Sequence, residues 1–339
     1  KRIILLSSIF TYTIATAQVP EDVLKMSFFP HSGTARNMAI GGAMGSLGGD
    51  INATFVNPAG IGMYKTGEFV ITPSFFLNNN KSNYRETIEK SKKNLFTIGT
   101  IGGVYGAPKS FKSDQSHAAS IAFTQVASYN NNFSYKGYNN YSSGAEQWAE
   151  EVSNSNLDIS AILNNPSYAF GSAPALYTYL VDTFRSNGDL YVNALPEFIL
   201  ANGQALLQQT TVNTRGGLYE LAGAYSVNFK DKFLVGASMG IPIMSYRNTT
   251  TFTESDTSSI TNNNFGYFKY TDEYRTVGAG INLKIGAIYK PTEYIRLGLA
   301  IHTPTYMMSL TDTRNTYLET QTENYAGLLK ASSKDFSNG

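Results

Sequence analysis

The chain has 339 residues, a formal net charge of +1 and no cysteine. The balanced charge argues against a basic surface for nucleic acid, and the lack of cysteine excludes disulfides, thiolate metal sites and a cysteine nucleophile. Charged residues make up 15% of the chain and aromatic residues 13%, whereas an average globular protein has about 25% charged residues. Few charges and many aromatic side chains are typical of a membrane β-barrel with aromatic girdles.

The first 17 residues have the three parts of a secretory signal peptide. Lys1 and Arg2 are basic, the run that follows is apolar, and Ala15-Thr16-Ala17 fits a cleavage site. The apolar run has about a dozen residues, fewer than the roughly 20 of a membrane-spanning helix. We therefore expect residues 1–17 to be removed on export; a short N-terminal anchor is the alternative.

Residues 18–66 are expected to form a compact domain with little regular structure. Residues 22–26 fit a short helix, and seven glycines lie among small apolar residues between positions 41 and 62. Glycine permits close backbone packing but costs conformational entropy, so a surrounding wall has to hold such a segment. Asn57-Pro58-Ala59-Gly60 is expected to be a turn, because proline lacks an amide hydrogen and disfavours a helical conformation of the residue before it. Asp50 is expected to cap this domain or to hydrogen-bond within it.

After Tyr64 the apolar residues recur at every second position, which is the period of a β-strand. In the clearest strands one face is large and apolar, and the other carries Gly, Ala, Ser and Asn with few charges. These strands are expected at residues 218–229, 233–243, 277–289 and 295–301. A soluble sheet would carry frequent charges on its water-facing side. The small residues therefore favour a barrel in which this face lines the interior and the apolar face contacts lipid. A soluble sandwich or barrel is the alternative.

The earlier strands are less regular. Residues 68–77 and 119–126 alternate, whereas residues 95–105 fit neither face. Pro73 lies inside the first of these strands and requires a bulge or a missing hydrogen bond. With these segments included, about seven or eight strands are expected in all.

The connections between strands differ at the two ends. Short polar turns close over residues 230–232 and 290–293, whereas residues 247–276 are rich in Thr, Ser and Asn and are expected to form a long loop. Short turns at one end and long loops at the other are typical of outer-membrane barrels, in which the long loops are extracellular.

The largest insert, residues 130–214, is long enough to require structure of its own. Helices are expected at residues 145–152, 173–184 and 195–207, stacked on the rim as an extracellular cap. An apolar groove between them would capture a hydrophobic ligand. The candidate lining residues are Trp148, Tyr177, Leu180, Phe184, Phe198, Ile199, Leu206 and Leu207. The alternative is that these side chains form a small core that holds the cap together.

Motifs for catalysis and metal binding are weak. Residues 236–240 match the G-x-S-x-G pattern of serine hydrolases, but that motif needs a strand-turn-helix context and here lies within a strand. His31, His117 and His302 are too few and too scattered to argue for a metal site. We expect no catalytic residue, metal or cofactor; the competing enzyme hypothesis, an outer-membrane lipase, would need Ser238 paired with His302.

Three short segments carry a family resemblance: residues 33–36 (GTAR), 41–50 (GGAMGSLGGD) and 57–60 (NPAG). Their order, after a signal peptide and before alternating strands, is similar to that in the FadL/TodX family, above all its Bacteroidetes branch. Residues 286–304 resemble the family's strand, periplasmic turn and following strand.

The resemblance implies an all-β membrane protein, a fourteen-stranded antiparallel outer-membrane β-barrel. Residues 67–339 would be the N-terminal part of its wall, since they lack the terminal amphipathic strand of such barrels. Residues 18–66 would be a hatch inside the barrel. The gating residues of this hatch would be Gly41, Gly42, Gly45, Gly48, Gly49, Asp50, Asn57, Pro58, Ala59 and Gly60.

The resemblance further implies a passive channel for hydrophobic compounds, such as long-chain fatty acids, in the outer membrane of a Gram-negative cell. The solute would be captured at the cap and released past the hatch. The expected partners are hydrophobic small molecules, outer-membrane lipid and lipopolysaccharide, and the barrel assembly machinery. Some relatives are outer-membrane scaffolds or shuttles in protein secretion, which is the alternative function.

Overall fold

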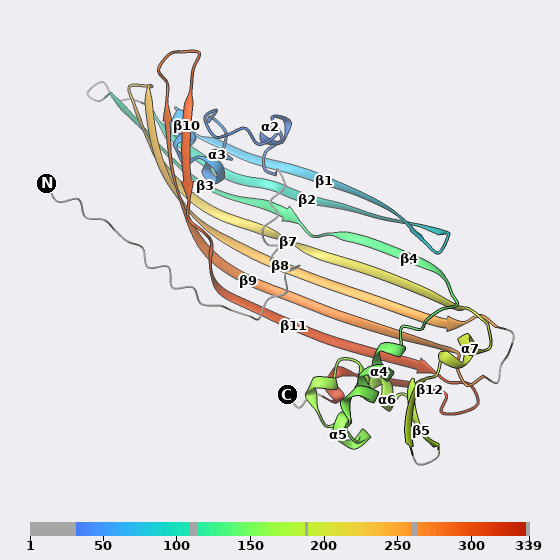
Figure 1. The fold of residues 1–339 in the computed structure, drawn as a ribbon. Helices are drawn as coiled ribbons and strands as arrows, with labels where there is room; N and C mark the ends of the chain where they lie inside the picture. Colours follow the sequence, from blue (N-terminus) through green and yellow to red (C-terminus); the bar gives the residue numbers. More distant parts are fainter. Residues whose placement is uncertain (1–31, 109–113, 187–188, 259, 261–262, 337–339) are drawn as a thin grey trace.

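The computed structural model describes residues 32–108, 114–186, 189–258, 260 and 263–336. The chain forms mostly antiparallel β-sheet, and one large sheet of ten strands runs along the molecule (Figure 1). The expected signal peptide, the short helix at residues 22–26 and His31 lie outside the described residues.

The strand order in this sheet is β1-β2-β3-β7-β8-β9-β11-β12, with β4 beside β7 and β10 beside β9. The strands are β1 (Glu68–Tyr84), β2 (Thr87–Ala107), β3 (Gln115–Ser128), β4 (Asn131–Asn139), β7 (Leu206–Phe229), β8 (Phe233–Asp256), β9 (Tyr267–Tyr289), β10 (Leu297–His302), β11 (Tyr306–Gln321) and β12 (Leu328–Ser332). Both β3 and β4 pair with β7, and both β10 and β11 pair with β9, so each of these pairs is one interrupted strand. The strands therefore occupy eight positions, in agreement with the number expected from the sequence.

The sheet exposes its apolar face and buries its polar face, which is the reverse of a soluble sheet. Large apolar side chains are exposed on one face; Met239 in β8 is 50% exposed and Ile285 in β9 is 62% exposed. On the opposite face Ser238 and Lys284, the neighbours of these residues, are 4% and 5% exposed. The predicted alternation is confirmed, and the small, polar face is the one that the rest of the chain covers.

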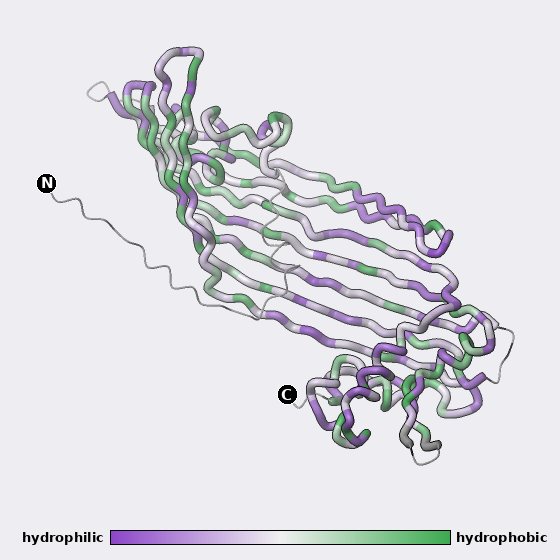
Figure 2. Tube along the Cα trace, in the orientation of Figure 1, coloured by the Kyte–Doolittle hydropathy of each residue, from purple (hydrophilic) through white to green (hydrophobic). Residues whose placement is uncertain are grey.

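The strands are longer than predicted. Because β8 runs to Asp256 and β9 begins at Tyr267, the long loop expected at residues 247–276 is wrong, and the connection spans residues 257–266. The added part is rich in threonine, which favours strands, but it is polar on both faces and so shows no alternation of hydropathy. Figure 2 shows the change along the strands, from alternating hydrophobic residues near the short turns to hydrophilic residues toward the far end.

At that far end, residues 140–205 leave the sheet and form a small layer against it (Figure 1). The insert is shorter than the expected residues 130–214, because β4 and the beginning of β7 belong to the sheet. Its elements are α4 (Glu146–Ser155), α5 (Ile159–Leu163), the 3-10 helix η2 (Pro166–Tyr168), α6 (Ser172–Tyr177), the hairpin β5 (Val181–Ser186) and β6 (Asp189–Ala194), and α7 (Glu197–Ala201).

The helices of the insert were predicted with mixed success. The helix expected at residues 145–152 is confirmed by α4. The helix expected at residues 173–184 is wrong beyond Tyr177, because Tyr179 has a φ of +55° and the chain continues into β5, where β-branched and aromatic residues favour a strand. The helix expected at residues 195–207 is reduced to α7, and Leu206 already belongs to β7.

The glycine-rich domain lies on the polar face of the sheet, near the short turns (Figure 1). We call its described part, residues 32–66, the hatch; it contains α2 (Ala35–Ala39), α3 (Ala53–Val56) and the 3-10 helix η1 (Pro58–Met63). The hatch contacts strands from β2, through Thr100, to β10, through Leu299, so the sheet curves around it. A last 3-10 helix, η3 (Ser333–Asp335), follows β12.

Candidate functional site

Asn57 fastens the hatch to the sheet, and it is fully buried. Its Nδ2 donates to the carbonyl oxygen of Gly45 at 2.6 Å and, at 3.3 and 3.4 Å, to those of Ala287 in β9 and Leu299 in β10. Its Oδ1 accepts from the amide of Ala59 at 3.1 Å. One side chain therefore joins the turn, an earlier part of the hatch and two strands.

Three glycines of the sheet make room for this turn, and we call Gly236, Gly286 and Gly298 the glycine seat. A methyl group on Gly236 would lie 2.6 Å from the amide nitrogen of Ala59, and one on Gly286 would lie 1.9 Å from Asn57 Oδ1. A methyl group on Gly298 would lie 2.1 Å from the carbonyl oxygen of Gly45. Gly236 and Gly286 are register partners. Sequence reasoning missed this seat, although glycines on the small face of consecutive strands were a signal for it.

The hatch is closed on itself around Asp50. Its Oδ2 accepts from Thr34 Oγ1 at 2.9 Å and its Oδ1 accepts from the amide of Asn52 at 2.8 Å. Gly48 has a φ of +60°, and a side chain there would lie 2.8 Å from the carbonyl oxygen of Gly60. Since neither position has room for a side chain, these two glycines let the middle and the end of the hatch touch.

The second half of the hatch is more deeply buried than the first half. Ile51 and Ile61 are fully buried, and Pro58, Ala59 and Gly60 are buried with them. In the first half, Met38 is 48% exposed and Ile40 is 37% exposed. The expected gating residues are therefore divided between the two parts. In the first half, Gly41 and Gly45 are exposed, and Gly42 and Gly49 are half-buried.

A buried ion pair lies beneath the hatch. Lys284 in β9 pairs with Glu220 in β7, and their side chains are 6% and 10% exposed. Gly240 in β8 makes room for it, because a methyl group there would lie 1.9 Å from Glu220 Oε1. The Phe55 ring of the hatch lies over the ammonium group, 5.9 Å from its centroid. Both glycines of the G-x-S-x-G pattern thus have a packing role, Gly236 in the seat and Gly240 at the ion pair.

Ser238 and His302 lie on either side of β9. Each is a register partner of Lys284, which places their Cα atoms about 10 Å apart at the usual strand spacing. His302 Nε2 hydrogen-bonds to the carbonyl oxygen of Val56 at 2.8 Å, and Ser238 is 4% exposed. This geometry gives no support to the lipase hypothesis.

The sheet has a break between β2 and β4. The ladder of β2 and β3 ends at Thr100 and Thr124, and beyond it β4 pairs only with β7 among the described residues. Side chains replace the missing ladder: Asn78 Nδ2 donates to the carbonyl oxygen of Asn130 at 2.6 Å, and Ser91 Oγ donates to that of Asn132 at 2.9 Å. Such side-chain contacts are easier to open than a continuous backbone ladder, because each is independent of its neighbours.

The break begins next to the start of the hatch. The register between β1 and β2 shifts at Pro73, which confirms the predicted irregularity and leaves Gly99 unpaired with β1. A methyl group on Gly99 would lie 3.2 Å from the carbonyl oxygen of Gly33. The first residues of the hatch therefore touch the sheet where its backbone ladder ends.

The eight candidate lining residues of the insert are not brought into one groove. Trp148, Leu180, Ile199 and Leu206 are at most 6% exposed and pack in one core with Phe268 and Leu318 of the sheet. The other four lie apart: Tyr177 packs on Phe336, Phe184 stacks on Tyr191, Phe198 is 46% exposed, and Leu207 is half-buried. For the buried four, this arrangement agrees with the alternative of a core that holds the insert together.

Glu254 near the end of β8 ties the insert to the sheet and is fully buried. Its Oε2 accepts from Gln208 Nε2 at 2.7 Å and from the amide of Gly144 at 3.0 Å, and its Oε1 accepts from Ser143 Oγ. Burial raises the pKa of Glu254, although these hydrogen bonds oppose the shift. The carboxyl group therefore joins β7, β8 and the start of α4 in a pH-sensitive way.

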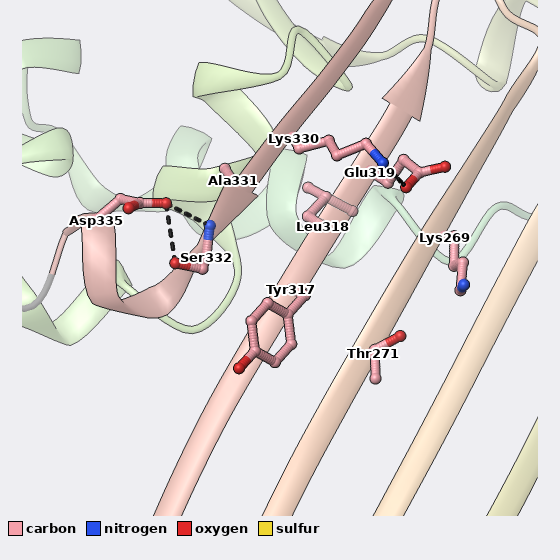
Figure 3. A pocket seen from close by; sticks show the side chains of 9 residues that line it. All are labelled: Lys269, Thr271, Tyr317, Leu318, Glu319, Lys330, Ala331, Ser332 and Asp335. Atoms are coloured by element: carbon pink, nitrogen blue, oxygen red, sulfur yellow. Dashed lines mark hydrogen bonds and ion pairs between the residues drawn. The ribbon is translucent and has the colours of Figure 1, made fainter.

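A concavity of about 350 Å³ lies at the far end of β9, β11 and β12 (Figure 3). Three of its charged side chains already have partners, since Lys330 pairs with Glu319 at 2.8 Å and Asp335 accepts from the amide of Ser332 at 2.7 Å. It lies far along the strands from the hatch, so we do not include it in the candidate site.

Over the described ranges, no helix is long and apolar enough to cross a membrane. In the same part of the chain, no group of three or more His, Cys, Asp or Glu side chains is placed to hold a metal ion. Comparisons with protein-family models, with curated proteins and with solved structures found no match to the chain.

Proposed function

We propose that this chain forms the wall and the hatch of an outer-membrane channel for hydrophobic compounds, in keeping with its resemblance to the FadL/TodX family. The observation that carries the proposal is the reversed sheet: its apolar face is exposed, and its polar face holds a hatch. Apolar surface left in water costs about 25 cal/mol per Å². Lipid around the sheet removes that cost, and a barrel is the form in which strands cross a membrane.

The height of the apolar face supports this placement. On the exposed face, the rows of register partners run from the aromatic row of Phe229, Phe233 and Tyr289 to the row of Tyr219, Ile243 and Ala279. These rows are ten residues apart, or about 33 Å along the strand. With the usual tilt of about 35–45°, the height is about 25 Å, which is that of the apolar band of outer-membrane barrels. We call the exposed residues between these rows the apolar band.

The route that we propose for the solute uses three features. It enters at the insert, which lies at the end away from the short turns, and moves along the polar face toward the hatch. It leaves sideways where the break between β2 and β4 begins, beside Gly99 and Gly33, at the outer edge of the apolar band. The burial of apolar surface drives the transfer, and no cofactor is required.

The test is uptake of a labelled long-chain fatty acid by cells that carry the full-length protein. We expect uptake to depend on the protein and to change when Asn57→Ala loosens the hatch. Gly223→Ala is the matched control, because a methyl group there would meet nothing closer than 3.8 Å. If the protein is in the outer membrane but takes up neither the fatty acid nor a panel of aromatic solutes, the secretion scaffold becomes the better proposal.

A further inference from the structure

Three arginines form a row on the exposed face of the sheet. Arg215 in β7 is the register partner of Arg247 in β8, and Arg247 is that of Arg275 in β9. All three side chains are exposed. They lie an even number of residues from Tyr219, Ile243 and Ala279 on the same unbroken strands, so they face the same way as the apolar band. We call these three residues the arginine row.

The charge of this row is not balanced within the described chain. Like charges directly opposite each other on neighbouring strands are destabilising. None of the three forms an ion pair with a described carboxylate, and Glu273, two positions along β9 on the same face, forms no salt bridge or hydrogen bond with Arg275. Arg215 Nε donates to Asn213 Oδ1 at 3.2 Å, and the same oxygen accepts from Lys93 Nζ at 3.1 Å. A fourth positive charge therefore joins the row, and the group needs an anion from outside.

The height of the row shows where that anion would come from; this step rests on the proposed function. The arginine row is fourteen residues along β7 from Phe229, or about 46 Å, which the same tilt reduces to about 35 Å. The apolar band ends at about 25 Å, so the row lies about 10 Å beyond its edge. Measured from the middle of the band, the row is about 22 Å out, which corresponds to the outer limit of the outer-leaflet headgroups in a bilayer about 40–45 Å thick.

We propose that the arginine row binds the phosphate groups of outer-leaflet lipid headgroups. Guanidinium groups match phosphate with two parallel hydrogen bonds, which an ammonium group cannot form. Three of them on strands about 4.8 Å apart present a continuous surface to a lipid with more than one phosphate. The β1–β2 hairpin has a similar pair, because Lys81 and Lys90 are exposed register partners that lie beyond Leu77 and Phe96 on the same face.

Native mass spectrometry of the full-length protein in detergent tests this proposal. The probes are a glucosamine-disaccharide lipid with two phosphates and the same lipid after dephosphorylation. Each arginine near an anionic surface strengthens binding about fivefold, so three give on the order of a hundredfold preference for the phosphorylated lipid. We expect the triple variant Arg215→Gln, Arg247→Gln and Arg275→Gln to lose that preference.

The matched control removes three positive charges at the other end of the same strands: Lys230→Gln, Lys232→Gln and Lys290→Gln. It should keep the preference. An equal loss in both triple variants, or no preference in the wild-type protein, would overturn the site. Displacement of the lipid by millimolar inorganic phosphate would assign the row to free phosphate and also overturn it. A wild-type protein that does not insert into vesicles contradicts the proposed function itself, whereas one that inserts without preference contradicts only this inference.

Discussion

Replacing Asn57 by alanine is expected to loosen the hatch without unfolding the sheet. The change removes two short hydrogen bonds, to Gly45 at 2.6 Å and from Ala59 at 3.1 Å, and two long ones, to Ala287 and Leu299. At about 0.5–1.5 kcal/mol for a well-formed bond and less for a long one, the loss is about 2–3 kcal/mol. The hatch should then open about 30- to 150-fold more often.

Hydrogen–deuterium exchange of the full-length protein in detergent measures this opening. Peptides that cover residues 44–63 should exchange faster by that factor in Asn57→Ala, because exchange follows the population of the open form. Peptides of β7 and β8 should keep their wild-type rates, since the sheet does not depend on this side chain.

Asn165→Ala is the matched control. Asn165 also precedes a proline at the start of a 3-10 helix and accepts from the amide two residues on, at 3.0 Å, but it lies on the surface of the insert. It should leave the hatch unchanged. Wild-type exchange over residues 44–63 in Asn57→Ala would refute the reasoning that this side chain holds the hatch in its seat.

Three further outcomes are expected. Gly286→Ala places a methyl group 1.9 Å from Asn57 Oδ1 and should speed exchange of the hatch, whereas Gly223→Ala should not. Lys284→Met leaves Glu220 buried without a partner and should lower the free energy of unfolding, measured in urea, by about 3–5 kcal/mol. The double variant Lys284→Met and Glu220→Leu should recover most of this loss. Burial raises the pKa of Glu254, so its stabilising contribution is full below about pH 4.3 and is lost as the pH rises through the raised pKa. The single tryptophan, Trp148, lies in the insert core, so its fluorescence can follow unfolding in urea. The urea midpoint should fall as the pH rises over that range, and in Glu254→Gln it should not change with pH. A wild-type midpoint that does not change with pH would contradict this prediction.

The strands of the apolar band could be predicted because large apolar residues on one face and small or polar residues on the other give a strict period of two. The same strands beyond Arg215, Arg247 and Arg275 could not, because polar residues occupy both faces there and no alternation of hydropathy survives. The insert was harder still. The helix expected at residues 173–184 combines residues of α6, its following turn and β5, because Leu176, Leu180 and Phe184 have helical spacing and such spacing alone does not exclude a turn and a strand.

The candidate site was predictable only in part. The break in the chain at Asn57 and Pro58 follows from local backbone chemistry, so sequence reasoning found it, although the structure has the 3-10 helix η1 there in place of a simple turn. The glycine seat and the arginine row depend on the register of strands, which place residues such as Gly236 and Gly286 opposite each other although fifty positions separate them. Register follows from turn geometry and from which face is buried. The sequence alone indicates neither of these over the whole length of the strands.

The contacts of Asn57 also set an order of folding. They join it to residues 230 and 242 positions later in the chain, and contacts so distant form slowly because long loops must close first. The hatch precedes the sheet in the chain, yet its seat exists only once β8, β9 and β10 are side by side. The segment that is synthesised before the wall strands is therefore among the last to be immobilised, and until then its apolar residues are open to chaperones and proteases.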